Sequence, residues 1–155
     1  MNKRTAIFPG SFDPITKGHE NILLRALPLF DEVIIAIGTN SSKQNYFTLE
    51  QREKWIRQVF AAQPKIRVET YSGLTIDFCR KMNASYILRG LRTSTDFEFE
   101  NLIAQNNKVM APEIESIFMI PVSELSAINS TIVRDIVRNG GDASPFVPNG
   151  IDLKV

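Results

Sequence analysis

Residues 5–19 have the sequence TAIFPGSFDPITKGH, in which a short apolar run is followed by a loop of turn-forming and polar residues. The run at residues 5–8 is typical of a buried β-strand, and Pro9 and Gly10 end it. The loop leads directly into a stretch of helical period that begins near His19. This order of strand, loop and helix predicts the first βα unit of a parallel sheet.

The same alternation of strand and helix patterns continues along the rest of the chain. Further apolar runs of strand length occupy residues 33–37, 66–70, 86–88 and 116–120. Helical periods lie near residues 19–30, 49–62, 74–82, 96–109 and 130–139. Thr48 with Gln51 fits a capping box at the start of one helix, and Gly140 fits the cap at the end of another. Five βα units predict an α/β fold with a five-stranded parallel sheet and helices on both faces.

The composition is that of one globular domain. The chain has 155 residues, of which 43% are hydrophobic and 23% are charged. We therefore expect a single domain over residues 1–155, with an irregular tail from about residue 143. Its net charge of +1 disfavours a general nucleic-acid binder. No apolar segment approaches the ~20 residues that cross a bilayer, and we expect no signal peptide, no membrane contact and a cytoplasmic location.

The counts of cysteine, histidine and glycine exclude several kinds of site. Cys79 and His19 are the only cysteine and histidine, so the chain has no intrachain disulfide and no Cys/His zinc cage of its own. The eight glycines form neither a GxGxxG fingerprint nor a Walker phosphate loop. We expect no metal site built from protein side chains, and any phosphate chemistry must use another loop.

The loop at residues 9–19 is the first candidate for a ligand site. In a parallel sheet covered by helices, the loops at the carboxyl ends of the strands form the ligand crevice, where helix N-termini favour anions. Ser11 and Thr16 offer hydroxyls, Gly18 lets a ligand approach the backbone, and His19 offers an imidazole N–H. These groups suit a phosphate, although an ordinary turn with a histidine at a helix start has the same residues.

The run PGSFDPITKGH, with TKGH at residues 16–19, resembles the HxGH loop of the phosphopantetheine adenylyltransferases, a family of the nucleotidyltransferase superfamily. The resemblance implies a Rossmann-like nucleotidyltransferase domain in which His19 stabilises the charge that builds during attack on the α-phosphorus of a nucleotide. This motif alone leaves cytidylyltransferases and nicotinamide-nucleotide adenylyltransferases open.

Four further segments resemble the same family in the same order, up to about Phe146. Residues 41–52 resemble its SxK…FxLxER loop, and residues 72–75 occupy the position where the family wraps a pantetheine arm. Residues 88–100 resemble its IRGLR…DFEYE segment, and residues 125–134 resemble its WSxISSTxVR segment. Leu125 replaces the usual tryptophan and Asn129 replaces the usual first serine of the last segment.

The resemblance implies a site residue by residue. His19, Lys43 and Arg92 are expected to be catalytic. The acceptor is expected to contact Ser11, Lys43, Thr75 and Arg89. ATP is expected to contact Ser11, Phe12, His19, Gly90, Leu91, Arg92, Glu100, Leu125, Ser126, Ala127, Ile128, Asn129, Ser130 and Thr131.

Simpler explanations exist for the charged and capping residues among these. Arg89 and Arg92 follow a buried strand, where permanent charges are costly without anionic partners. Bound phosphates are one such partner, and ion pairs with Asp96 or Glu98 are the alternative. Residues 129–131 suit the phosphates of ATP at a helix N-terminus, or a plain N-cap cluster.

The implied reaction joins 4′-phosphopantetheine to the AMP part of ATP, with Mg²⁺ bound to ATP, by direct attack without a covalent enzyme intermediate. The resemblance also implies a homohexamer and feedback inhibition by CoA. Three alternatives remain at this point. They are a transferase for another phosphorylated acceptor, such as nicotinamide mononucleotide or glycerol phosphate, a non-catalytic nucleotide-binding module, and a structural or partner-binding domain.

We predict that Lys43→Ala mainly weakens binding of 4′-phosphopantetheine, because the resemblance places this ammonium on the acceptor's phosphate. Steady-state kinetics with each substrate varied in turn is the measurement. The expected result is a raised KM for the acceptor with little change in the KM for ATP. An equal loss of affinity for both substrates would show that Lys43 has been placed wrongly.

Overall fold

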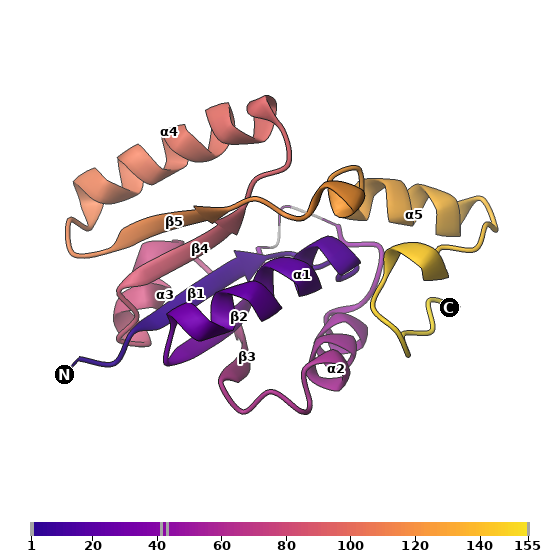
Figure 1. Ribbon diagram of the computed structural model, residues 1–155, viewed down its shortest axis with the longest axis horizontal. Helices are drawn as coiled ribbons and strands as arrows, with labels where there is room; N and C mark the ends of the chain where they lie inside the picture. The colour runs from indigo at the N-terminus through magenta and orange to yellow at the C-terminus, as the bar shows by residue number, and fades with distance from the viewer. Residues whose placement is uncertain (1, 41, 43, 155) are drawn as a thin grey trace.

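The computed structural model describes residues 2–40, 42 and 44–154. Its centre is a sheet of five parallel strands in the order β3-β2-β1-β4-β5 (Figure 1). These strands are β1 (Thr5–Gly10), β2 (Glu32–Gly38), β3 (Ile66–Tyr71), β4 (Tyr86–Gly90) and β5 (Glu115–Met119). The predicted five-stranded parallel sheet is thereby confirmed.

Five α-helices surround this sheet. They are α1 (Lys17–Ala26), α2 (Leu49–Val59), α3 (Thr75–Lys81), α4 (Ser94–Met110) and α5 (Ser130–Arg138). Short 3₁₀ turns follow at Leu27–Leu29, Ser123–Leu125 and Ser144–Phe146. In the described part of the chain, none of the helices is long and apolar enough to cross a membrane.

Two apolar clusters show which helices cover which face of the sheet. Alternate residues of a strand point to opposite faces, and Ile7 of β1 lies in a different cluster from Ala6 and Phe8. The Phe8 cluster contains residues of α1, α2 and α5, whereas the Ile7 cluster contains residues of α3 and of the chain after α4. Helices therefore cover both faces, as predicted, with α1 and α3 on opposite sides (Figure 1).

The predicted caps are present, and some element ends differ from the prediction. Thr48 and Gln51 form a reciprocal capping box at the start of α2. Gly140 has φ +75° directly after α5, where its N–H donates to the carbonyl of Val137 at 3.0 Å. The first helix ends at Ala26 rather than near residue 30, because Pro28 supplies no N–H for a continuing α-helix.

The strand order places a crevice beside the end of β1. From β1 the chain moves outward to β2 and β3, and then crosses to β4 on the other side of β1. The loops after β1 and β4 therefore depart in opposite directions and leave open space at the carboxyl edge of the sheet. Figure 1 shows α5 beyond this edge.

Candidate active site

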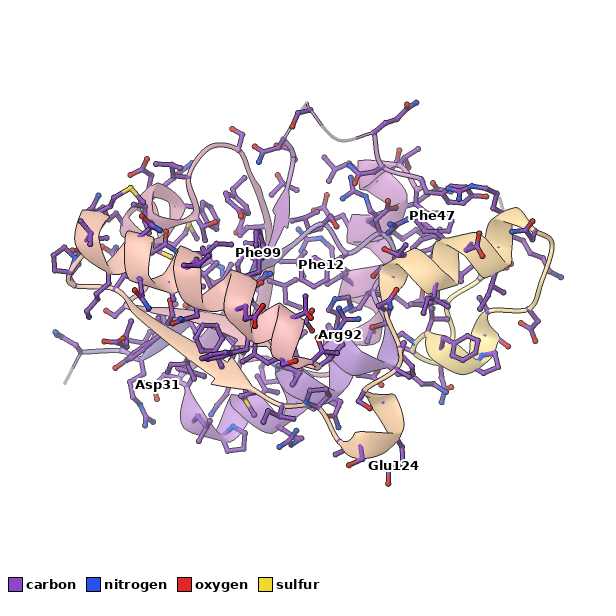
Figure 2. All side chains as sticks on the ribbon, turned by 90° about the horizontal axis from the view of Figure 1, so that it is seen from above. Phe12, Asp31, Phe47, Arg92, Phe99 and Glu124 are labelled. Carbon is purple, nitrogen blue, oxygen red and sulfur yellow. The ribbon has the colours of Figure 1, made fainter. Side chains whose placement is uncertain are left out.

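A cleft of about 380 Å³ occupies this edge of the sheet. Its walls come from the end of β1 and the loop after it, the start of α1, the end of β4 with the first half of α4, and the start of α5. Figure 2 shows Phe12 and Arg92 in this region. The lining residues are Phe8, Pro9, Gly10, Ser11, Phe12, Thr16, Gly18, His19, Ile22, Arg89, Gly90, Arg92, Asp96, Glu100, Pro121, Ile128, Asn129, Ser130, Thr131 and Arg134.

His19 is held in one orientation by the first turn of α1. Its Nδ1 accepts the backbone N–H of Thr16 at 3.0 Å, while the His19 N–H donates to the Thr16 hydroxyl at 3.4 Å. An Nδ1 that accepts a hydrogen bond carries no proton, so the ring proton of the neutral imidazole is on Nε2. Nε2 has no hydrogen-bond partner among the described residues and remains a donor for a ligand in the cleft.

The surroundings of His19 keep the imidazole neutral. Burial, together with the charges of Arg89 and Arg92, lowers the pKa of His19 to about 4. The ring of Phe12 lies against it, with ring centroids 5.1 Å apart in an edge-to-face arrangement. Phe12 is itself 2% exposed, so its main contact is with His19 and the core. At neutral pH His19 is therefore a fixed hydrogen-bond donor without a charge.

Arg89, at the end of β4, forms a two-pronged ion pair with Glu100 of α4. Its Nε and Nη2 donate to the two carboxylate oxygens at 3.0 and 2.6 Å, and its Nη1 donates to the carbonyl of Pro9 at 2.6 Å. The pairing of β1 with β4 stops at Ile7, which leaves the Pro9 carbonyl available for Arg89. This pair fixes the guanidinium at the junction of β1, β4 and α4.

Arg92 forms an ion pair with Asp96, which is one of the two carboxylate partners considered from the sequence. Its Nε donates to Asp96 at 3.2 Å, and its Nη1 donates to the carbonyl of Ile128 at 3.2 Å. Arg92 thus bridges the loop after β4 and the segment before α5, across one end of the cleft. Glu98, the other carboxylate considered from the sequence, is exposed.

The start of α5 closes the opposite wall of the cleft. Asn129 caps the helix by accepting the N–H of Ile132 at 2.8 Å, which is the capping role considered above. Ser130 donates to the carbonyl of Pro14 at 2.8 Å, and Arg134 donates to the hydroxyl of Thr131 at 3.1 Å. The first turns of α1 and α5 both line the cleft, and each presents the positive end of its helix dipole there.

A second cavity of about 190 Å³ adjoins the cleft on the α3 and α4 side of the sheet. Thr75, the first residue of α3, lines it, and its hydroxyl lies 2.9 Å from the Tyr71 hydroxyl. Apolar side chains of Ile87, Ile103 and Phe118 form further walls. Arg89 and Glu100 line both cavities, so one ion pair marks the boundary between them.

The structure brings most of the expected site residues to these two cavities. The cleft contains those from the β1 loop, His19, Arg89, Gly90, Arg92 and Glu100, as well as residues 128–131. Thr75 lies in the second cavity. Leu91, Leu125, Ser126 and Ala127 do not line the cleft, and Lys43 lies outside the described residues. Glu100, expected to accept from a nucleotide, has both carboxylate oxygens on Arg89.

Three charged residues near the cleft received no role from the sequence. They are Asp13, Arg52 and Arg134, and the first two are 4% and 3% exposed. Arg52 lies on the apolar side of α2 together with Trp55 and Ile56, which are also buried. The sequence did contain a signal for Arg52, because this charged residue lies at helical spacing from Trp55 and Ile56 on the apolar side of the helix.

The described residues contain no group of three or more His, Cys, Asp and Glu side chains placed to hold a metal ion. The acidic residues that line the cleft are Asp96 and Glu100, and both are engaged by arginines. A divalent cation in this cleft would therefore take most of its ligands from the phosphates of a nucleotide and from water.

Comparison with known proteins identifies close relatives over nearly the whole chain. The family model described as cytidylyltransferase-like matches residues 7–136. Phosphopantetheine adenylyltransferase of Flavobacterium psychrophilum is 52% identical over 151 residues, which are 97% of this chain and 99% of that protein. The proteins of the same name from Leptospira biflexa and Bacteroides fragilis are 47% and 45% identical, covering 95% and 97% of this chain, and 92% and 99% of their own lengths.

A solved structure with the same fold is a bifunctional NMN adenylyltransferase/ADP ribose pyrophosphatase from Francisella tularensis. It superposes with a TM-score of 0.73 at 20% identity, over 94% of this chain. The match spans 45% of that larger chain, so it concerns one part of a longer protein. At this identity it shows a shared fold.

We predict that the single histidine titrates far below its ordinary pKa of about 6.5. A ¹⁵N-resolved NMR titration should show the Nε2–H form at pH 7 and a midpoint near 4. Because only the unfolded chain takes up this proton between these values, the contribution of His19 to stability falls as the pH drops from 6.5 toward 4. A midpoint near 6.5 would contradict a neutral imidazole at this site.

Proposed function

This chain belongs to the phosphopantetheine adenylyltransferase family, and on that premise we propose that it transfers the adenylyl group of ATP to 4′-phosphopantetheine, which yields dephospho-CoA and pyrophosphate. The observation that carries the proposal is the pair of adjoining cavities that share Arg89 and Glu100. Two adjoining pockets that meet at a cation suit a reaction between two phosphorylated molecules. We propose that residues 1–155 form one catalytic domain.

The chemical character of the two cavities suits two different substrates. The cleft has helix N-termini, His19 and Arg92 along its walls, and these groups favour the triphosphate of ATP. The second cavity has mainly apolar walls with the hydroxyls of Tyr71 and Thr75, and this mixture suits the amide-containing pantetheine arm. The acceptor's phosphate then lies at the boundary, beside Arg89.

The proposed reaction is a direct displacement. An oxygen of the acceptor's phosphate forms a bond to the α-phosphorus of ATP, and the bond from that phosphorus to the bridging oxygen of pyrophosphate breaks. A phosphate monoester has its second pKa near ~6, so it is already largely ionised at neutral pH and needs no general base. The work of the protein is to hold two anions together against their repulsion.

His19 and Arg92 are proposed to stabilise the charge of the transition state. The Nε2–H of His19 donates to an α-phosphoryl oxygen, and since Nδ1 is anchored to Thr16, no reorientation of the ring is needed at the moment of reaction. Arg92 approaches the same region from the loop after β4, and Ser130 contributes its backbone N–H in the first turn of α5, since its hydroxyl donates to the Pro14 carbonyl. Ser11, Lys43 and Arg89 are proposed to hold the acceptor.

Mg²⁺ is proposed to enter as the complex with ATP, where it neutralises phosphate charge. The scarcity of free carboxylates in the cleft supports this assignment.

CoA contains both a pantetheine arm and an adenine nucleotide, so we propose that it competes for the two cavities as an inhibitor. We propose that the reaction takes place in the cytoplasm, without nucleic-acid or membrane partners.

We also propose that the enzyme is a homohexamer that uses α4 for self-association. Of the residues of α4, only Glu100 is buried, and Figure 1 shows this helix at the outer side of the sheet. Phe99, Leu102 and Val109 are 65%, 61% and 81% exposed. An apolar surface of this kind is usually covered by a partner, and a second copy of the same chain is the expected one.

The prediction for α4 is that Leu102→Glu lowers the assembly mass, because it introduces a charge into the apolar surface. Size-exclusion chromatography with light scattering is the measurement. The matched control is Ala62→Glu, which introduces the same glutamate at an exposed position after α2, outside the α4 surface. A monomeric wild-type protein, or an unchanged mass for Leu102→Glu, would contradict the proposed interface.

The experiment that tests the function is pyrophosphate release from Mg·ATP with 4′-phosphopantetheine, nicotinamide mononucleotide or glycerol 3-phosphate as the acceptor. Release that depends on 4′-phosphopantetheine supports the proposal. Activity with only one of the other acceptors would keep adenylyl transfer and change the substrate. Binding of ATP without release in all three reactions would instead favour a nucleotide-binding module.

Substitutions at His19 distinguish the role of Nδ1 from the role of Nε2. We expect His19→Ala to lower kcat by about 10²-fold or more, since one such donor typically contributes ~3 kcal/mol. His19→Asn keeps an acceptor near the position of Nδ1 but no donor at Nε2, so it should lose as much. His19→Gln keeps a donor near Nε2 and should lose less. Lys54→Ala, at an exposed position outside the cleft, is the control, and wild-type turnover in His19→Ala would refute the role.

A further inference from the structure

Asp13 and Arg52 are two buried charged residues that the proposed reaction does not use. Asp13 is 4% exposed and Arg52 is 3% exposed. Neither has a close ion-pair partner among the described residues, where the shortest such distance is 3.9 Å, from Asp13 to Arg134. Both side chains instead bind backbone groups.

The two side chains hold the same short segment, Tyr46 and Phe47, from opposite sides. The carboxylate oxygens of Asp13 accept the backbone N–H groups of Tyr46 at 2.8 Å and Phe47 at 2.9 Å. The guanidinium of Arg52 donates through Nε to the carbonyl of Phe47 at 3.2 Å. The backbone of this segment is therefore fixed through both its donors and an acceptor.

Arg52 also reaches the loop after β1. Its Nη1 donates to the carbonyl of Ser11 at 2.6 Å, so one guanidinium joins Ser11 to Phe47. The ring of Phe47 is 1% exposed and lies against Trp55, with ring centroids 4.9 Å apart. Figure 2 shows Phe47 on the side of the molecule that holds α5. The segment is thus anchored by its side chain as well as by its backbone.

Burying these two charges has a high free-energy cost, so the arrangement contributes little to the stability of the fold. Two charges are removed from water and receive neutral backbone partners, whereas apolar residues of similar size would fill the same space at lower cost. The cost is visible in Arg52, because burial lowers its pKa and the charge of Asp13 only partly opposes this. What the two charges provide, and apolar residues cannot, is a fixed spacing between the β1 loop and the segment before α2.

The distance between the β1 loop and the segment before α2 affects the part of the proposed site that binds the acceptor's phosphate. The described contacts tie the loop of Ser11, which lines the cleft, to Tyr46 and Phe47 before α2. Lys43, proposed to bind the acceptor, precedes these two residues in the chain and lies outside the described residues. We propose that Asp13 and Arg52 are positioning residues that set the distance between these two loops and thereby orient the acceptor's phosphate for attack. This inference rests on the proposed function.

The test uses single and double substitutions in the full-length enzyme. In Asp13→Asn only one carboxamide oxygen is left for two N–H groups, and Arg52→Met removes both donors. We expect each to lower kcat/KM for 4′-phosphopantetheine by about tenfold or more, since misplacement of a reacting group by an ångström can cost up to about 10²-fold. The KM for ATP should rise less than the KM for 4′-phosphopantetheine. Arg52→Lys, which keeps the charge and one donor, should lie between.

The double variant Asp13→Asn/Arg52→Met distinguishes positioning from stability. The charges of Asp13 and Arg52 favour each other in the wild type, and the double variant removes both. Its thermal midpoint should therefore recover relative to Arg52→Met, while its acceptor kinetics should not recover. Recovery of both would overturn the proposal. So would wild-type acceptor kinetics in the single variants, or an equal rise in the KM values for both substrates.

Two controls complete the experiment. Ile56→Val removes a buried methyl group from α2 and touches no loop carbonyl, so it should lower the thermal midpoint without a change in acceptor KM. The wild-type enzyme is measured first. Its inactivity with 4′-phosphopantetheine would refute the proposed function, whereas an active wild type with unaffected variants would refute only the positioning role.

Discussion

The parallel pairing of β1 with β2 on one side and with β4 on the other is the constraint on which the rest of the structure depends. Because the chain leaves β1 toward one edge of the sheet and returns to β4 on the other, the loops after these two strands diverge. The gap between them becomes the cleft, and the first turns of α1 and α5 reach it from opposite walls. The anion-binding groups are contributed by parts of the chain that are far apart in sequence and meet only through this strand order.

The electrostatic design of the cleft is one of balanced charges. Arg89 and Arg92 are each held by a carboxylate, and the only histidine is kept neutral by burial and by these same arginines. The guanidinium groups are therefore oriented before any substrate arrives, with N–H groups remaining for phosphate oxygens. Preorganised donors of this kind stabilise developing charge without rearrangement at the time of reaction. A neutral His19 fits this design because the proposed nucleophile is already ionised and no proton has to be moved.

Local patterns in the sequence were sufficient for the strands, the helices and the loop that contains His19. Continuous apolar runs of strand length and helices at period 3.6 depend on neighbours within a few residues, and so does the capping box of Thr48 and Gln51. Apart from Phe47, which is five residues from Arg52, the partners of Arg89, Asp13 and Arg52 lie 11 to 80 residues away in the chain, and no local pattern specifies them. Glu100 illustrates the difference, because its ion pair with Arg89 could not be predicted from the sequence, while its expected contact with the nucleotide stays a prediction. The exposure of the apolar side of α4 could be seen only in the fold, because the spacing of its apolar residues in the sequence is the same as that of a buried helix.

The central claim is that the cleft joins ATP to a second phosphorylated substrate directly, with no adenylyl group on the protein. Exchange of labelled pyrophosphate into ATP tests this claim most directly, because exchange requires the bond to the α-phosphorus to break and re-form. The enzyme should incorporate label into ATP when 4′-phosphopantetheine is present and incorporate none when it is omitted. Incorporation without the acceptor would reveal a covalent adenylyl-enzyme and would contradict the account, as would a lack of exchange with both substrates present.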